Sequence, residues 1–353
     1  MSRLDKKASP FGSDSTPNRL PQRVVIALTR RERTLFLDDN AAASLQTAVV
    51  CVADDGDLVS AGWQQRLEKW RPNVLVTGWT TPPIPETWTE TPECPLKYVC
   101  HVTGSVRQLV PRSFIARGGL VTNWGDQVSD QVAEHGLLLA LAALRNNPAW
   151  RPFISRPPQT RRLEEIKTQT LFNRRIGLHG FGSIARALIR LLKPFGGTIS
   201  AYSNGVPVEL MQSCGVNPCA SLKELFAKSE IVFECESLTE ASAGSVNDEV
   251  LAALPDDGVF VNIARGSLVD DAALQREGAS GRLRLALDVA AGEPLTLRSP
   301  YARMPAVVLS PHIAGPTLDR YRFCGSLAWD HLSTYLAGKL PLTVTLEMYD
   351  RAT

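Results

Sequence analysis

The sequence has no apolar run long enough to span a membrane, no CxxC pair of cysteines and very little net charge. None of its apolar stretches reaches the roughly 18 residues that a transmembrane helix requires. The formal net charge of +2 over 353 residues creates no strong field for nucleic acid or for an anionic membrane surface. We therefore expect a chain that binds neither membrane nor nucleic acid.

Cysteine is present but is not arranged as a disulfide framework or as a metal site. The seven residues are scattered, and the closest pair, Cys214 and Cys219, has no nearby cysteine or histidine to complete a site. This usage predicts reduced thiols, a cytoplasmic location and no bound metal. Residues 1–22 are rich in serine, proline and charge and lack the apolar core of a signal peptide, so we expect a disordered tail there.

What the sequence does contain is a regular alternation of apolar strands and helical segments. The first part predicts strands at residues 24–28, 49–52, 73–79, 96–104 and 119–123. The second part predicts strands on both sides of a glycine turn and at residues 230–235, 258–264, 283–289 and 306–310. This alternation predicts an α/β protein with two doubly wound parallel sheets. Residues 23–125 with 317–353 form one predicted domain, which a last strand at 342–348 rejoins, and residues 126–316 form the other.

The glycine turn joins an apolar strand to an amphipathic helix. Gly180, Gly182 and Ala185 match the pattern GxGxx(G/A) that binds dinucleotides when it follows a strand and opens a helix. The first glycine permits the tight turn, the second lets the backbone approach a pyrophosphate, and the alanine allows close packing of helix and strand. The helix N-terminus then favours the anion.

A second helix, predicted over residues 129–147, is apolar on almost every side after Glu134. A helix without a polar face is buried, so we expect it to lie between domains or between subunits.

Polar side chains follow three of the predicted strands of the second domain. Arg265, Glu293 and His312 each come soon after a different strand, and Asp288 ends its own strand. Ligands of such sheets bind beyond the carboxyl ends of the strands, so the four side chains are expected at one crevice. Arginine binds a carboxylate with two hydrogen bonds, histidine exchanges a proton near neutral pH, and a glutamate orients the histidine. Next to a nicotinamide, this set suits hydride transfer to a 2-keto acid.

The segments VNIARGSLVDDAAL (261–274), ALDVAAGEPL (286–295) and VVLSPHIAGPT (307–317) resemble the signatures of the D-isomer-specific 2-hydroxyacid dehydrogenases, which depend on NAD or NADP. The resemblance extends over almost the whole chain from about Arg23. It implies that residues 126–316 form the NAD(P)-binding Rossmann domain. It also implies that residues 23–125 with 317–353 form a flavodoxin-like substrate (catalytic) domain across a cleft.

The resemblance also implies a role for each candidate residue. Arg265 matches the substrate-binding arginine, His312 the proton donor and acceptor, and Glu293 the carboxylate hydrogen-bonded to it. The backbone of Gly104 and Ser105 is expected to hold the substrate carboxylate. The expected cofactor-binding residues are Gly180, Phe181, Gly182, Ser183, Ile184, Ser203, Ile263 and Asp288, of which Asp288 orients the nicotinamide amide.

Two positions near the cofactor depart from the family pattern. Ser203 stands where an acidic residue usually accepts hydrogen bonds from the adenosine ribose, and no arginine follows to bind a 2′-phosphate. The missing carboxylate removes the discrimination against NADP, so the sequence slightly favours NADP over NAD as the cofactor. Ser183 replaces an arginine common near the pyrophosphate. The sequence assigns no purpose to Glu234 and Glu236.

The predicted substrate loop also departs from the pattern. Ser105, Val106 and Arg107 replace a glycine-rich turn followed by an aspartate. Arg107 either pairs with an acidic substrate or is solvated. His101 is expected to be a buried core histidine rather than a ligand contact. Trp79 and Trp124 are expected to be core residues, with substrate contact as the alternative.

Other histidines, His135, His179 and His331, are interpreted as structural. The leading functional hypothesis is an NAD(P)-dependent 2-hydroxyacid dehydrogenase that forms a homodimer through the apolar helix. The alternative is an NAD(H)-sensing binding protein of the same fold, which would show tight cofactor binding and little turnover.

Overall fold

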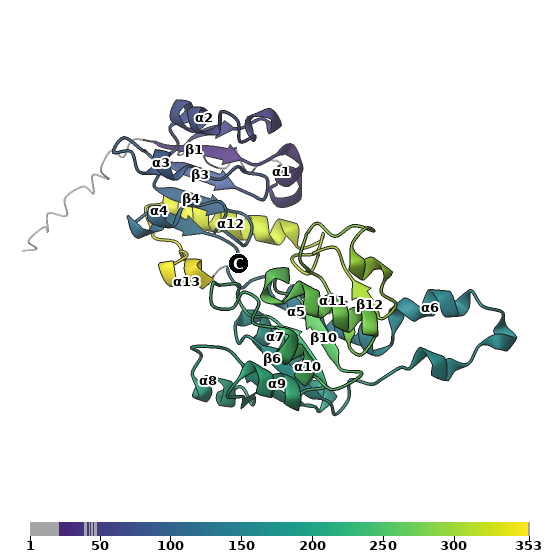
Figure 1. The fold of residues 1–353 in the computed structure, drawn as a ribbon. Helices are drawn as coiled ribbons and strands as arrows, with labels where there is room; N and C mark the ends of the chain where they lie inside the picture. Colours follow the sequence, from purple (N-terminus) through teal and green to yellow (C-terminus); the bar gives the residue numbers. More distant parts are fainter. Residues whose placement is uncertain (1–20, 39–40, 42, 44, 46–47, 352–353) are drawn as a thin grey trace, which may run out of the picture.

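The computed structural model describes residues 21–351 except 39–40, 42, 44 and 46–47, and it contains two parallel sheets (Figure 1). Residues 1–20 of the expected tail lie outside the described residues, and β1 begins at Gln22. The first sheet has the order β2-β1-β3-β4-β5, which is the flavodoxin-like order. Its strands are β1 (Gln22–Ala27), β2 (Ala48–Val52), β3 (Val74–Thr77), β4 (Tyr98–His101) and β5 (Leu120–Thr122).

The helices of this first unit come from both ends of the chain. They are α1 (Arg30–Phe36), the short 3-10 helix η1 (Asp55–Asp57), α2 (Trp63–Trp70), α3 (Glu86–Thr89), α4 (Arg112–Ala116), α12 (Tyr321–Leu336) and α13 (Leu346–Arg351). Helix α12 packs against α1 and β4, and α13 packs against α4. The end of the chain therefore returns to the domain in which it began.

The second sheet has the order β12-β11-β10-β9-β6-β7-β8. Counted from β6, this is the strand order of a Rossmann fold, and the chain reverses direction across the sheet between β6 and β9. Its strands are β6 (Arg175–His179), β7 (Thr198–Tyr202), β8 (Asn217–Pro218), β9 (Ile231–Glu234), β10 (Val259–Asn262), β11 (Arg284–Leu287) and β12 (Val307–Leu309). Both predicted sheets are confirmed. The two-residue β8 was missed.

Helices cover both faces of the second sheet. They are α5 (Ser129–Leu144), α6 (Asn147–Ile154), α7 (Ser183–Leu192), α8 (Val208–Ser213), α9 (Leu222–Lys228), α10 (Asp248–Ala253) and α11 (Asp271–Ser280), with 3-10 helices η2 (Pro158–Thr160), η3 (Leu163–Ile166), η4 (Lys193–Phe195), η5 (Gly266–Leu268) and η6 (Pro300–Arg303).

The inner strands are apolar on both sides because each sheet separates two cores, whereas the edge strand β2 is only partly buried. Along β1, Val25 and Ala27 enter one core, whereas Val24 and Ile26 enter the other. Successive side chains of a strand point to opposite faces, so a strand covered on both faces is apolar without a polar side. Strands β9 and β10 are likewise buried along their full length.

The apolar helix α5 lies inside the unit built on the second sheet. It packs against α7 and against the sheet at β10, β11 and β12. Val132, Ala133, Leu139 and Ala140 belong to the same core as α7. The expectation that this helix lies between the two domains is wrong, because most of its apolar side chains are covered within this one unit. Leu138 is 58% exposed, and a contact of the helix with a second subunit stays a prediction.

The predicted final strand at 342–348 is also wrong. Residues from Leu346 form α13, whose first turn is capped by the Thr345 hydroxyl, which accepts a hydrogen bond from the Met348 N–H at 3.1 Å. The segment does rejoin the first domain, since the Val344 N–H donates to the Val121 carbonyl at 2.7 Å.

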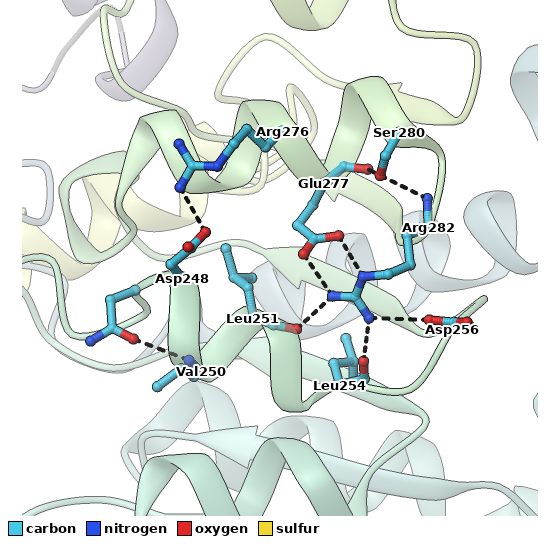
Figure 2. A network of polar contacts seen from close by, with 10 residues as sticks. Asp248, Val250, Leu251, Leu254, Asp256, Arg276, Glu277, Ser280 and Arg282 are labelled. Atoms are coloured by element: carbon cyan, nitrogen blue, oxygen red, sulfur yellow. Dashed lines mark hydrogen bonds and ion pairs between the residues drawn. The ribbon is translucent and has the colours of Figure 1, made fainter.

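An arginine clamp stiffens the edge of the second sheet opposite the carboxyl ends (Figure 2). Arg282 donates from Nε and Nη2 to the Glu277 carboxylate at 2.8 and 2.7 Å. It also donates to the carbonyl oxygens of Leu254 and Leu251 at 2.6 and 2.8 Å. These contacts join the end of α10 to the end of α11 and leave the carboxyl edge free for a ligand.

Candidate active site

The glycine turn between β6 and α7 fits a dinucleotide pyrophosphate. Gly180 has φ +95°, and a Cβ there would lie 2.6 Å from the Glu236 nitrogen, so only glycine suits the position. A Cβ on Gly182 would meet nothing within 4 Å, so the backbone faces open space. Helix α7 begins without a side-chain cap, so its first N–H groups remain available to an anion.

A pocket of about 430 Å³ opens beside this turn, at the point where the strand order reverses. Of the expected cofactor residues, Phe181, Gly182 and Ser203 line it. Ser183 and Ile184 lie on the first turn of α7, where the Ser183 hydroxyl accepts from Ser129 Oγ at 2.8 Å. The full lining comprises His179, Phe181, Gly182, Tyr202, Ser203, Asn204, Val206, Leu222, Glu236, Ser237, Thr239, Ala241, Ser242, Ser245 and Arg351.

A buried ion pair lies between β6 and β9 at the edge of this pocket. His179 and Glu234 are register partners on the two strands, and His179 Nδ1 lies 2.6 Å from Glu234 Oε2. Burial lowers the pKa of His179, but the charge and hydrogen bond of Glu234, with the charge of Glu236, outweigh burial and raise that pKa above its ordinary value. The His179 ring also stacks near Tyr202.

The three candidate catalytic side chains lie at the ends of adjacent strands. Arg265 follows β10, Glu293 follows β11 and His312 follows β12, and these strands are neighbours in the sheet. Burial lowers the pKa of the Arg265 guanidinium, and the charge of Glu293 opposes that change. The three groups therefore share one edge, as predicted.

The turn that carries Arg265 is held by the Asn262 side chain and by a close backbone contact at Gly266. Asn262 holds it by accepting from the Ala264 N–H at 3.1 Å and donating to the Arg265 carbonyl at 3.1 Å. A Cβ on Gly266 would lie 2.2 Å from the Ala290 carbonyl carbon, so glycine is required where the two strand-end loops touch. Ile263 is buried, and a Cβ on Gly136 of α5 would meet its side chain; its expected contact with cofactor stays a prediction.

His312 and Glu293 form a hydrogen-bonded pair. His312 Nδ1 lies 2.7 Å from Glu293 Oε2, and the other carboxylate oxygen accepts from the Ala290 N–H at 3.1 Å. About half of the His312 side chain is exposed, so its second ring nitrogen is reachable from solvent. His312 has φ +56°, a left-handed conformation that is uncommon for a residue with a side chain.

Asp288 organises the loop that carries His312. Its buried carboxylate accepts from the N–H groups of Ile313 and Ala314 at 2.9 and 3.0 Å and from Ser310 Oγ at 2.5 Å. His135 Nε2 of α5 lies 3.3 Å away. Burial raises the pKa of Asp288, but these donors outweigh burial and lower it to about 2. Its expected contact with the nicotinamide amide stays a prediction.

The expected substrate loop lies at the carboxyl end of β4. Ser105 is exposed, and the Gly104 carbonyl accepts from Asn123 Nδ2 at 2.5 Å. A Cβ on Gly104 would meet the Trp124 ring, so the indole lies directly against this loop. Arg107 donates from Nη1 to the Leu238 carbonyl at 3.0 Å, which links the loop to the second domain.

The remaining aromatic and histidine positions are largely structural. His101 is buried between Thr77 and Thr103, with ring nitrogens 2.9 and 2.5 Å from their hydroxyl oxygens, and burial lowers its pKa to about 4. This confirms the expected core histidine. Trp79 is 53% exposed, however, and packs edge-on against Trp124, so it is not the expected core residue.

Sequence reasoning missed the partners of two expected residues. Glu236 accepts a hydrogen bond from Ser203 Oγ at 2.7 Å, and His135 with Ser310 contacts Asp288. Of these, only Ser310 and Glu236 carried a usable signal, because Ser310 ends a predicted strand and Glu236 directly follows one. In the described residues no group of three or more His, Cys, Asp or Glu side chains could hold a metal ion, and no described helix is long and apolar enough to cross a membrane.

The family model for the D-isomer specific 2-hydroxyacid dehydrogenase NAD binding domain matches residues 137–314. The chain belongs to this family. A D-3-phosphoglycerate dehydrogenase of Methanocaldococcus jannaschii is 29% identical over 225 residues, which cover 64% of this chain but 42% of that relative. The chain thus matches less than half the length of this relative.

Two further proteins are matched over more of their own length. A glyoxylate reductase of Pyrococcus furiosus is 29% identical over 234 residues, which cover 65% of this chain and 69% of that enzyme. The solved structure of a glyoxylate reductase from Paecilomyes thermophila superposes with a TM-score of 0.75 at 22% identity, covering 92% of this chain and 98% of that one. The latter likeness supports the two-domain fold.

Proposed function

We propose that this protein is an NAD(P)-dependent oxidoreductase that interconverts small 2-keto acids and D-2-hydroxyacids. The observation that carries the proposal is the arrangement of Arg265, Glu293 and His312 on three adjacent strand ends, with the His312–Glu293 hydrogen bond of 2.7 Å. Family membership supports the same activity, and the relatives named glyoxylate reductase suggest a small substrate.

Each side chain has a part that follows from its chemistry. The Arg265 guanidinium is a cationic fork of N–H donors, and it binds the substrate carboxylate or carbonyl oxygen. His312 presents Nε2 to the carbonyl oxygen and donates its proton there during reduction. Glu293 fixes the ring orientation through Nδ1 and stabilises the protonated ring.

The pocket beside the glycine turn is where a dinucleotide would be held, on the free N–H groups of α7. When bound, the nicotinamide supplies or accepts the hydride. On the substrate side, the backbone at Gly104 and Ser105 is proposed to hold the substrate carboxylate. Trp124 covers Gly104, so the ring limits the space available there.

The test is a spectrophotometric screen with NADH and NADPH against glyoxylate, hydroxypyruvate and pyruvate. We expect oxidation of at least one reduced cofactor with at least one keto acid. Tight cofactor binding without turnover on any substrate would instead favour the sensing alternative, which the presence of all three catalytic candidates does not support.

We also propose that the protein forms a homodimer, through an arm rather than through α5. The arm (residues 147–166) follows α5 and projects from the body (Figure 1). It exposes Trp150, Ile154 and Leu163, the last at 75%. We infer that a second copy covers these apolar side chains. Sedimentation of the wild type as a dimer, and of an Ile154→Asp/Leu163→Asp variant as a monomer, is the expected result; a monomeric wild type contradicts it.

A further inference from the structure

The end of β7 carries no acidic residue, yet a carboxylate lies there. Ser203, one residue beyond β7, donates from Oγ to Glu236 Oε2 at 2.7 Å. Glu236 comes from the loop after β9, and both residues line the pocket beside the glycine turn. The chain thus places a carboxylate from a different strand next to the position where serine replaced the expected acid.

Glu236 is held in this place by a set of hydrogen bonds. Its Oε1 accepts from the Ser237 N–H at 2.8 Å, and its own N–H donates to Glu234 Oε1 at 2.9 Å. Glu234 is fully buried, so the loop is anchored to the sheet. A carboxylate offers about four lone-pair positions, and the described bonds use two on Glu236. It therefore retains acceptor capacity toward the pocket.

We propose that Glu236 selects a dinucleotide with unmodified adenosine ribose hydroxyls, so that the protein prefers NAD(H) to NADP(H). The inference rests on the proposed function, since it assumes that the pocket holds the adenosine end of that cofactor. Ribose hydroxyls donate to a carboxylate, whereas a 2′-phosphate presents a charge of about −2 and would be repelled. Ser203 acts as a positioning residue, and the preference is opposite to the lean that the sequence alone suggested.

The other charged side chains around the pocket are consistent with a fixed negative charge there. Glu234 lies 2.6 Å from His179, whose protonated ring balances the Glu234 charge within the sheet. Arg351 of α13 lines the same pocket and would suit a 2′-phosphate, but it is exposed and lies 3.9 Å from Glu347. No described hydrogen bond fixes the Arg351 guanidinium at the pocket, whereas three bonds fix Glu236. The preorganised charge is therefore the negative one.

The experiment measures dissociation constants for NADH and NADPH by quenching of tryptophan fluorescence, which does not depend on turnover. The wild type is expected to bind NADH at least about tenfold more tightly than NADPH. Glu236→Gln should reduce this ratio by about tenfold or more, and Ser203→Ala should reduce it by less. Glu240→Gln removes the same charge from an exposed position of the same loop and should leave the ratio unchanged.

Three results would overturn the inference. The wild type could bind NADPH as tightly as NADH. The ratio of the two dissociation constants could stay unchanged in Glu236→Gln, or it could change in Arg351→Gln and not in Glu236→Gln. If these results appear while the protein still reduces a keto acid, the inference alone fails. If neither cofactor binds, the inference and the proposed function fail together.

Discussion

Two histidine–glutamate pairs lie at the carboxyl edge of the second sheet, and they differ mainly in exposure. His179 and Glu234 are 2.6 Å apart, with 4% and 0% of their side chains exposed. His312 and Glu293 are 2.7 Å apart, with 48% and 29% exposed. The buried pair cannot reach a substrate and serves to join β6 to β9. The exposed pair keeps a free ring nitrogen, so the same contact is available for proton transfer.

The largest expected effect concerns the exposed pair. Replacing the proton donor by His312→Gln should lower the turnover of a keto acid about 10²- to 10⁴-fold, because the glutamine amide cannot deliver a proton. The measurement is the steady-state rate at saturating cofactor. The dissociation constant for NADH serves as the control and should not change. Turnover within about threefold of the wild type would remove His312 from its proposed role.

Removing one partner of the buried pair should lower the stability of the fold. Glu234→Ala leaves His179 without its partner in the sheet, at a cost of about 3 kcal/mol in the free energy of unfolding, measured in urea. Glu234→Gln should cost less, because the amide oxygen can still accept from the Glu236 N–H while its NH₂ donates to a neutral His179. Equal stability of the wild type and the alanine variant would show that the pair is not coupled to folding.

Glu293→Ala tests the exposed pair for both stability and turnover. The exposed pair should contribute less than about 1 kcal/mol to the free energy of unfolding, because solvent screens it. Turnover should nevertheless fall by about tenfold or more, since the His312 ring loses its orientation. The pH dependence of the rate should also change, which a purely structural role would not produce. A variant that is less stable than Glu234→Ala but fully active would reverse the comparison.

The smallest effect is the pH dependence of stability. The pKa of His179 is raised in the folded state above the ordinary value of 6.5, so the stabilisation from its pairing with Glu234 is fully present below about pH 6.5. This contribution is lost as pH rises through the raised pKa. Urea unfolding between pH 6 and pH 9 should therefore show a fall in the wild type that is flatter in Glu234→Ala. Parallel curves would contradict the assignment.

The exposed pair could be predicted from the sequence, and the buried pair could not. Arg265, Glu293 and His312 each stand in a short motif beside its own strand, so their convergence requires only that parallel strands end at one edge. His179 and Glu234 are 55 positions apart and meet only because β9 pairs with β6. That pairing depends on the strand order, which periodicity does not determine. The same limit concealed the contact between Ser203 and Glu236.

The error at the C-terminus had a different cause. The β-branched residues of LTVTLEM favoured a strand, but Thr345 caps a helix, Glu347 lies in its first turn and Arg351 in its last. These helix signals were present in the sequence. The apolar α5 was misplaced because composition reveals that a helix is buried but not which neighbour buries it.

Asp288 shows how few independent changes this site allows. One carboxylate receives hydrogen bonds from the loop of His312 and contacts His135 of α5, so a change in any of these partners alters the position of the histidine. Mutations at residues 135, 288 and 310 should therefore be tolerated together or not at all. The loop, the helix and the strand therefore behave as one structural unit, in which a change on one element has to be matched by changes on the other two.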